Sequence, residues 1–249
     1  HQELRIMGTQ TGEVWGDSGN PPPGSPLSRN PSGAIEQGIS APWSIAKLDD
    51  ESLMWLGGNV RGAGIVWRAT GYAPQRVSTH AVEVAIQRYG NLGDAVAYTY
   101  QENGHSFYSL SFPSANATWV YDATIGMWHQ RGRWNTTHAR YDADVARFHA
   151  YVWGKHFVGG GDGTGNIYEQ SVDIATDAGG PLRWWRRAPH VNHEAKILRH
   201  NKFTLAMEVG VADQGTDPQV TLNWSNDGGK TWRTPRTAST GKVGEYRKR

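Results

Sequence analysis

Residues 107–129 read FYSLSFPSANATWVYDATIGMWH, and this stretch decides the expected fold. Residues 107–112 and 118–121 are rich in the aromatic and β-branched side chains that favour strands, and a turn containing Pro113 and Asn116 separates them. A second turn with Gly126 leads into a third segment that carries Trp128. The pattern predicts three antiparallel strands joined by tight turns.

The first two strands of this unit recur on both sides of it. The recurrences, each a short strand followed by an aromatic strand, are 53–56 with 64–67 and 155–158 with 166–168. The aligned aromatic residues Trp67, Tyr121 and Tyr168 are 54 and 47 residues apart, which is close to the length of a four-stranded propeller blade. One such hairpin cannot bury its own apolar face, so neighbouring units are expected to pack together. We therefore predict an all-β, β-propeller-like fold; a β-sandwich with recurring strands is the alternative.

Other segments interrupt the strand pattern. Residues 4–15 read as a hairpin that turns at Thr11-Gly12, and the Pro-rich residues 16–34 read as an irregular loop. Residues 79–90 have helical periodicity, with Thr79 as the N-terminal cap and Gly90 as the stop. We predict one short helix that packs between blades.

The C-terminal part has a different pattern. Apolar residues alternate with polar ones at Phe203, Leu205, Met207, Val209 and Val211, and again at Val220, Leu222 and Trp224. This alternation predicts an additional antiparallel hairpin or sheet between residues 203 and 232 with one buried face. We expect two parts: residues 1–175 form propeller-like blades, and residues 176–249 form a sheet that continues or closes the propeller. Residue 1 is His and residues 244–249 look like the start of a strand, so we expect both ends to continue in a longer chain.

Composition limits the possible functions. The 249 residues include 12 Trp, 10 Tyr, 31 Gly and 12 Pro, as expected for short strands between tight turns. The net charge of +2 does not require a nucleic-acid partner but leaves room for a local basic surface. Cysteine is absent, which excludes a disulfide framework, a thiolate metal site and a cysteine nucleophile. No apolar run is long enough to predict a membrane-spanning helix.

Residues 225–232 match the Asp-box pattern Ser-x-Asp-x-Gly-x-Thr-Trp. Its defined positions are Ser225, Asp227, Gly229, Thr231 and Trp232. The Asp carboxylate can accept backbone N–H bonds inside the turn, and the glycines allow positive φ. We interpret the box as a structural fold-back with its Trp packed beneath the hairpin. A sialidase is not favoured, because no converging set of Arg, Tyr and carboxylate residues is marked and one box is present where sialidases usually have several.

The strongest charge bias lies between residues 183 and 202. The candidate contact residues are Arg183, Trp184, Trp185, Arg186, Arg187, Lys196, Arg199 and Lys202, with Glu194 as the opposing charge. Basic and aromatic side chains together are compatible with phosphate contact and base stacking. They are equally compatible with a protein interface or with a solvated strand pair in which Arg stems cover Trp. All three readings stay open from sequence.

We predict no metal, cofactor or catalytic residues. His190, His193 and His200 are close in sequence with Glu194 between them, but they lack the spacing of a metal motif. The Gly-rich residues 159–165 lack the Lys-Ser/Thr of a phosphate-binding loop and lead into a strand, so we interpret them as a turn between blade strands.

Several segments together resemble a known family. They are 76–83 (RVSTHAVE), 117–129, 163–169 (GTGNIYE), 207–211 (MEVGV), 217–220 (DPQV), the Asp box and 241–246 (GKVGEY). In this order they resemble the tail hub, or packaged-DNA stabilisation, proteins of short-tailed bacteriophages. The combination of DPQV, Asp box and GKVGEY is the most specific part. Family members usually have further strands on both sides, which leaves the blade number open.

The resemblance implies a structural function. Such proteins assemble as homo-oligomeric rings below the portal and its adaptor, help to retain packaged DNA and attach distal tail proteins. The chain would then be a non-enzymatic component of the virion tail, assembled in the host cytoplasm, with possible non-specific contact to genomic DNA. The alternative from another class is a glycan-binding or glycan-cleaving, sialidase-like tail component, because Trp-rich β scaffolds also bind sugars.

Overall fold

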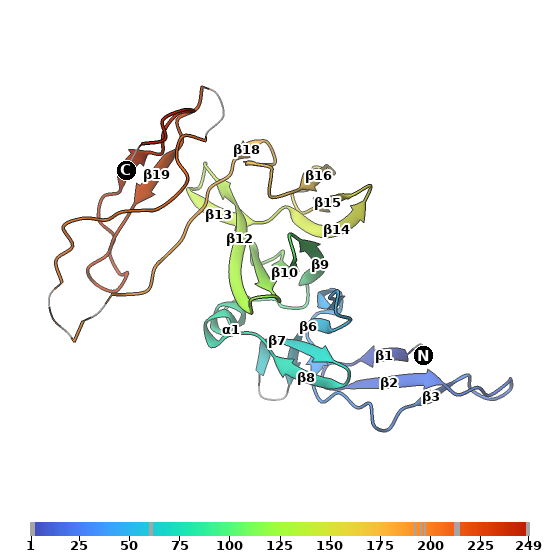
Figure 1. The fold of residues 1–249 in the computed structure, drawn as a ribbon. Coiled ribbons are helices and arrows are strands. Elements are labelled where there is room, and N and C mark those ends of the chain that lie inside the picture. Colours follow the sequence, from blue (N-terminus) through green and yellow to red (C-terminus); the bar gives the residue numbers. More distant parts are fainter. Residues whose placement is uncertain are drawn as a thin grey trace. The chain divides into compact units, whose positions relative to one another are not determined.

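The computed structural model describes residues 3–59, 62–191, 193–194, 196, 198–211 and 215–247 (Figure 1). These residues form mostly strands in antiparallel sheets, and the described part of the chain contains one α-helix. The chain divides into two compact units, residues 1–184 and residues 185–249. Each unit is described by itself below.

The first unit begins with two sheets. Sheet 1 contains β1 (Glu3–Met7), β2 (Gly12–Asp17) and β3 (Leu27–Arg29) in that order. Sheet 2 contains β4 (Gly38–Ile39), β6 (Leu53–Asn59), β7 (Gly62–Thr70) and β8 (Ala73–Arg76), and β5 (Ala46–Lys47) also pairs with β6. A 3-10 turn, η1 (Pro42–Ser44), lies between β4 and β5. The expected N-terminal hairpin is present, but it turns at residues 8–11, and Gly12 already belongs to β2. The predicted loop 16–34 contains the short strand β3.

Two further sheets continue the unit in chain order. Sheet 3 contains β9 (Val96–Glu102), β10 (His105–Phe112), β11 (Ala117–Asp122), β12 (Met127–Asn135) and β13 (Arg140–Ala143). Sheet 4 contains β14 (Ala146–Val152), β15 (Lys155–Gly160) and β16 (Ile167–Gln170). A small hairpin, β17 (Thr176–Asp177) with β18 (Gly180–Pro181), follows. All three recurring hairpins expected from the sequence are therefore strands. The turn predicted at residues 159–165 lies at residues 161–166, between β15 and β16, because Gly159 and Gly160 still belong to β15.

Two equivalent hairpin turns use different residues. Asn103-Gly104 joins β9 to β10, and Trp153-Gly154 joins β14 to β15; all four residues have positive φ. A two-residue turn of this kind matches the twist of the strands and favours Asn-Gly. Trp153, with φ of 53°, occupies the position that Asn103 fills in the other turn. A bulky residue is rare in this conformation, so the turn itself does not explain the Trp.

Neighbouring sheets share buried cores. Val14 of sheet 1 and Ile35 of the segment that follows it pack with Trp55 and Ala69 of sheet 2. The opposite face of sheet 2 packs on sheet 3 through Met54, Leu56, Val66, Tyr108, Leu110 and Phe112. Sheet 3 packs on sheet 4 through Tyr98, Tyr100, Ala146 and Val158. Because Met54, Trp55 and Leu56 alternate between two cores, sheet 2 is buried on both faces, as expected for an internal blade of a propeller.

The helix α1 (His80–Gln87) lies within the predicted residues 79–90, but it ends at Gln87 with Arg88 as its C-terminal cap and not at Gly90. The Thr79 hydroxyl accepts from the Val82 N–H at 3.4 Å and caps its first turn. Val82 and Ile86 join the core between sheets 2 and 3. The buried Glu83 carboxylate accepts from the Ser78 hydroxyl at 2.6 Å and pairs with the Arg76 guanidinium at the end of β8. The helix therefore covers the hydrophobic core between sheets 2 and 3 with its apolar face.

The second unit corrects one expectation from the sequence. The predicted strand at 203–211 is not formed: residues 203–209 have no regular structure, and the side chains of Phe203, Leu205 and Met207 are exposed. The antiparallel pair is instead β19 (Gln219–Leu222) with β20 (Arg236–Ser239). An alternating pattern shows that a segment could form one face of a sheet, but a strand also needs a neighbouring strand whose backbone is in register. For β19 this neighbour is β20 and not the segment 203–211.

Candidate functional site

The basic and aromatic segment begins at Arg183, which packs onto the first unit. Its guanidinium lies 3.8 Å from the ring centroid of Trp134 on β12. Trp134 contacts the ring of Tyr141 on β13, and the Tyr141 hydroxyl donates to the carbonyl of Arg183 at 3.4 Å. Arg183 is therefore held against the β12–β13 hairpin and is less available to a partner than its neighbours in sequence.

Arg187 links the segment to the Asp box inside the second unit. Its guanidinium lies 5.3 Å from the ring centroid of Trp185 and 4.8 Å from that of Trp232, the last residue of the box. Trp232 keeps 42% of its surface exposed, so it does not pack beneath the hairpin as we expected from sequence. Arg187 covers part of this ring instead.

The other candidate contact residues point into solvent. Trp184 keeps 85% of its surface exposed, and Trp185, Arg186, Arg199 and Lys202 are also exposed. The Lys196 ammonium pairs with the Glu194 carboxylate at 3.0 Å, with both side chains largely in water. The structure thus brings Trp185, Arg187 and Trp232 together and leaves Arg186, Arg199 and Lys202 exposed.

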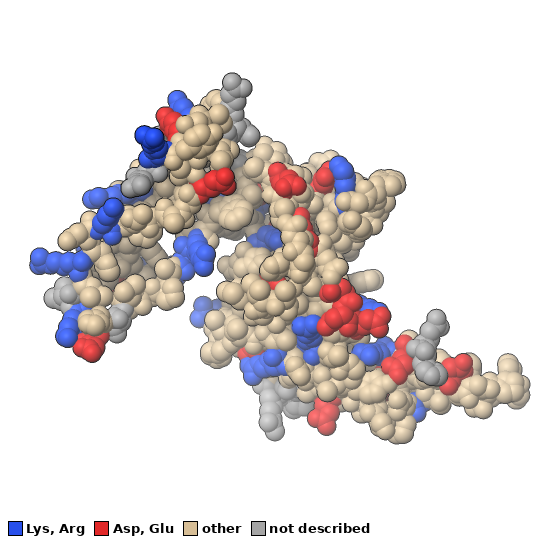
Figure 2. Space-filling view, viewed as in Figure 1, with Lys and Arg blue, Asp and Glu red and all other residues tan. Residues whose placement is uncertain are grey.

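Charge is divided unequally between the two units. Residues 185–249 contain twelve Lys and Arg against six Asp and Glu, and residues 1–184 contain thirteen against seventeen. The overall charge of +2 therefore combines a net +6 on the second unit with a net −4 on the first. Figure 2 shows the Lys and Arg side chains spread over the second unit with few acidic groups beside them. A surface of this sign attracts polyanions.

The Asp box folds as a closed set of hydrogen bonds. The Ser225 hydroxyl donates to Asp227 Oδ1 at 2.7 Å and accepts from the Gly229 N–H at 2.8 Å. Asp227 accepts from both the N–H and the hydroxyl of Thr231. Gly228 and Gly229 both have positive φ, the conformation that needs glycine. The bonds from Thr231 and then from Ser225 lower the pKa of Asp227 well below its usual range.

Replacing Asp227 with alanine is expected to open this turn locally. The Thr231 amide loses its charged acceptor and should exchange with solvent roughly tenfold faster, because bonds to a charged group are the stronger ones. Hydrogen exchange followed by NMR measures this. Glu208→Ala removes an exposed carboxylate of the same unit and should leave Thr231 unchanged. Equal exchange in both variants would show that the carboxylate does not hold the turn.

The histidines of the segment do not assemble into a metal centre. His190, His193 and His200 are exposed. Over the whole described part of the chain, no group of three or more His, Cys, Asp or Glu side chains is placed to hold a metal ion. Within the same residues, no helix is long and apolar enough to cross a bilayer.

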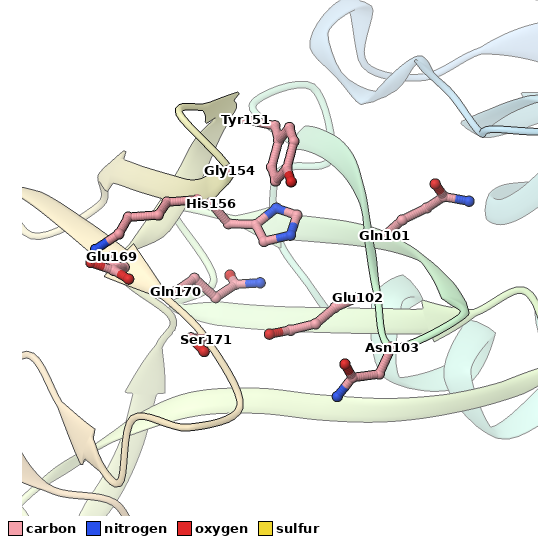
Figure 3. A pocket seen from close by; sticks show the side chains of 10 residues that line it. Gln101, Glu102, Asn103, Tyr151, Gly154, His156, Glu169, Gln170 and Ser171 are labelled. Carbon is pink, nitrogen blue, oxygen red and sulfur yellow. Dashed lines mark hydrogen bonds and ion pairs between the residues drawn. The ribbon is translucent and has the colours of Figure 1, made fainter.

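A polar pocket that the sequence did not predict lies between sheets 3 and 4 (Figure 3). It has a volume of about 320 Å³ and lies at the ends of β9, β15 and β16. Its lining residues are Gln101, Glu102, Asn103, Tyr151, Gly154, Lys155, His156, Glu169, Gln170 and Ser171. These residues come from three separate stretches that carry no motif, so no sequence signal marks them as a set.

Comparison with known families agrees with the two units. The family model described as Bacteriophage P22 Gp10, beta-propeller, matches residues 1–172, and the model described as Bacteriophage P22 Gp10, beta-sandwich, matches residues 183–249. A search of curated proteins found no match to the chain. The first unit, with its antiparallel sheets sharing cores in chain order, agrees with the propeller description. The chain therefore belongs to the Bacteriophage P22 Gp10 family, as a structural protein of the phage virion tail built from a β-propeller followed by a β-sandwich.

Proposed function

We propose that this chain is a tail hub subunit that acts without catalytic turnover. It assembles in the host cytoplasm as a homo-oligomeric ring below the portal and its adaptor, after the genome has been packaged. It helps to retain the packaged DNA and attaches distal tail proteins. The family match supports the structural role, and the observation that carries the DNA contact is the net +6 charge on residues 185–249 with Arg and Trp side chains exposed.

The two parts of the chain divide these tasks. We assign the protein contacts of the ring to the propeller-like residues 1–175 and the contact with DNA to residues 176–249. Rotational symmetry repeats each subunit contact around a ring, so contacts that are weak singly become strong together. The same symmetry repeats the basic surface of every copy around the channel.

The contact with DNA is electrostatic and independent of base sequence. Arg186, Arg199 and Lys202 are exposed cations that can neutralise backbone phosphates, and each phosphate contact releases counterions from the DNA. Trp184 and Trp185 offer rings on which unpaired bases can stack. Arg187 contributes less, because its guanidinium already lies against the rings of Trp185 and Trp232.

Reversing two of these charges tests the assignment. The double variant Arg186→Glu with Arg199→Glu should weaken binding to a random double-stranded DNA, and the slope of log K against log salt should fall by about 2, one for each lost phosphate contact. Fluorescence anisotropy over a range of salt concentrations measures both. Sedimentation velocity on the same samples reports whether the ring still forms.

The matched control is Lys47→Glu, which reverses an exposed charge on the first unit. It should leave the DNA affinity and its salt slope near those of the wild-type chain. If the double variant and the control bind DNA alike, the assignment of residues 183–202 to DNA is wrong. A ring that dissociates in the double variant while DNA binding persists would instead place this segment at a subunit interface.

A further inference from the structure

Two histidines of sheet 4 meet at its contact with sheet 3. His149 lies on β14 and His156 on β15, and both side chains are half-buried. The Nε2 atom of His149 and the Nδ1 atom of His156 are 2.9 Å apart and share a hydrogen bond. From sheet 3, the rings of Tyr98 and Tyr100 lie 5.6 Å and 5.9 Å from the ring of His149. The histidine pair is therefore part of the contact between the two sheets.

The hydrogen bond limits the charge that this pair can carry. One of the two facing nitrogens must carry a proton, and the other must offer its lone pair. The pair can take up one additional proton on an outer nitrogen and still keep the bond. When both rings are imidazolium ions, each of the two facing nitrogens carries a proton. The bond is then lost, and two positive charges repel each other across the same short distance.

The carboxylates around the pair are engaged elsewhere. Glu102 accepts from the Val172 N–H at 2.9 Å, Glu169 pairs with Lys155 at 2.9 Å, Asp162 accepts from the Tyr168 hydroxyl at 2.6 Å, and Asp144 lies 3.9 Å from Arg131. Within the described residues, none of these four carboxylates is hydrogen-bonded to either imidazole. Burial and then the charge of His156 lower the pKa of His149. The folded chain therefore resists the second proton.

Other groups on sheet 3 do not offset this charge. Burial raises the pKa of both Tyr98 and Tyr100, so these side chains stay neutral in acid. At 5.6 Å between ring centroids, Tyr98 offers a protonated His149 only a weak attraction. The guanidinium of Arg131 on β12 donates to the Tyr100 hydroxyl at 2.7 Å and adds a permanent positive charge on this side. On sheet 4, the ring of Tyr151 lies beside His156, 4.8 Å away (Figure 3).

Two further histidines lie on the face of sheet 3 that packs on sheet 4. Burial and then Arg131 lower the pKa of His129, while Asp122 opposes them. His105 faces the carboxylate of Asp122 at 2.7 Å, so a charge on its ring is attracted and not repelled. His129 would respond to acid in the same direction as the pair, and an experiment has to separate the two.

Sheet 4 is held on sheet 3 by a small core. Within the described residues, four buried side chains form it, whereas twelve form the core between sheets 2 and 3. A sheet of three strands is only marginally stable unless its apolar face is packed. The loss of a hydrogen bond at this contact therefore has a larger effect than it would have deeper in the unit.

We propose that the contact between sheets 3 and 4 is an acid-sensitive switch. In mild acid both His149 and His156 become charged, their hydrogen bond is lost, and sheet 4 separates from sheet 3 while sheets 1 to 3 keep their fold. A histidine whose pKa is lower in the folded chain contributes stability that is present above its unfolded pKa of about 6.5. This contribution is lost as the pH falls from there toward the folded pKa. The switch does not depend on the contact with DNA, so either proposal can fail without the other.

The test is hydrogen exchange of the full chain at about pH 7.5 and about pH 5, corrected for the effect of pH on the chemical exchange rate. The amides of β15, the central strand of sheet 4, should lose about tenfold in protection relative to those of β11 in sheet 3, because one unit of pKa shift is tenfold in an equilibrium constant. An NMR titration of the ring C–H signals should also show His149 titrating below a free histidine.

The double variant His149→Gln with His156→Asn removes both titrating groups. The two amides still offer a donor and an acceptor, so this variant should keep equal protection of β15 at both pH values. His129→Gln should respond to acid as the wild-type chain does, and so should His138→Gln, which replaces an exposed histidine.

Four results would overturn the proposal. They are equal losses of protection in β15 and β11, an unchanged acid response in the double variant, an acid response abolished by His129→Gln, and a wild-type His149 that titrates at or above about 6.5. The last result needs no variant, so the proposal stays open to refutation even if the double variant does not fold.

Discussion

Replacing Trp55 with alanine is expected to lower the free energy of unfolding of the first unit by about 3 to 5 kcal/mol. Trp55 keeps only 1% of its surface exposed and joins sheet 1 to sheet 2, where it packs with Val14, Ile35 and Ala69. Its Nε1 also donates to the carbonyl of Gly38 at 3.2 Å, so the substitution leaves both a cavity and a buried acceptor without its donor. Urea denaturation followed by circular dichroism measures the loss.

Trp43→Ala is the control for the same change of residue. Trp43 keeps 73% of its surface exposed, and the substitution should change the stability by no more than about 0.5 kcal/mol. Since an average domain is stable by only about 5 to 15 kcal/mol, the two variants should differ clearly. Similar midpoints for both would mean that sheets 1 and 2 do not share a core around Trp55.

Arg76→Ala is expected to destabilise the same unit by about 2 to 3 kcal/mol near neutral pH. The Glu83 side chain is only 3% exposed, and the substitution would leave its charge with the Ser78 hydroxyl as its remaining side-chain partner. Half of Arg76 is in water, which places the expected loss at the lower end for a broken buried pair. Lys47→Ala, which breaks an exposed pair with Glu51, should cost no more than about 0.5 kcal/mol.

The pH dependence distinguishes this mechanism from a loss of packing. Burial raises the pKa of Glu83, but the hydrogen bonds from Arg76 and Ser78 outweigh it, and the net shift is downward. In the wild-type chain Glu83 therefore contributes stability above its unfolded pKa, and this contribution is lost as the pH falls through its folded pKa. Without Arg76 the carboxyl can be protonated more easily, so the deficit of the variant should shrink toward about pH 4. A deficit that is constant with pH would point to lost packing by the Arg76 stem instead.

The sequence predicted the parts of the fold that depend on neighbouring residues. The recurring hairpins around Trp67, Tyr121 and Tyr168 are present, and so is the helix with its Thr79 cap. These elements are set by turn residues and by local periodicity, which a single sequence contains. The strands β3, β4, β5 and β13 were not predicted, because two to four residues are too few to show a period and their pairing depends on the rest of the sheet. The seven-residue strands β9 and β14 were not predicted either.

The candidate site was predicted less completely, for a related reason. The sequence marks residues 183–202 as basic and aromatic, but it does not show that Arg183 packs on Trp134 or that Arg187 packs on Trp232. Those partners are 49 and 45 residues away, and nothing in the spacing connects them. The pocket beside Tyr151 shows the same limit, since it exists only because two sheets bring their turns together.

The order of the strands has a consequence for how the chain is synthesised. Within the described residues, every sheet of the first unit pairs strands that follow one another closely along the chain, and β4 with β6 has one short strand between. Because these strand pairings are local in sequence, each sheet can form as soon as its own residues leave the ribosome, before the later sheets exist. Each nascent sheet then presents one apolar face until the next is made. Sheet 4 is the last of these four sheets to emerge, and its outer face, with Phe148, Val152 and Ile167 exposed, has no later sheet of the first unit to cover it within the described residues.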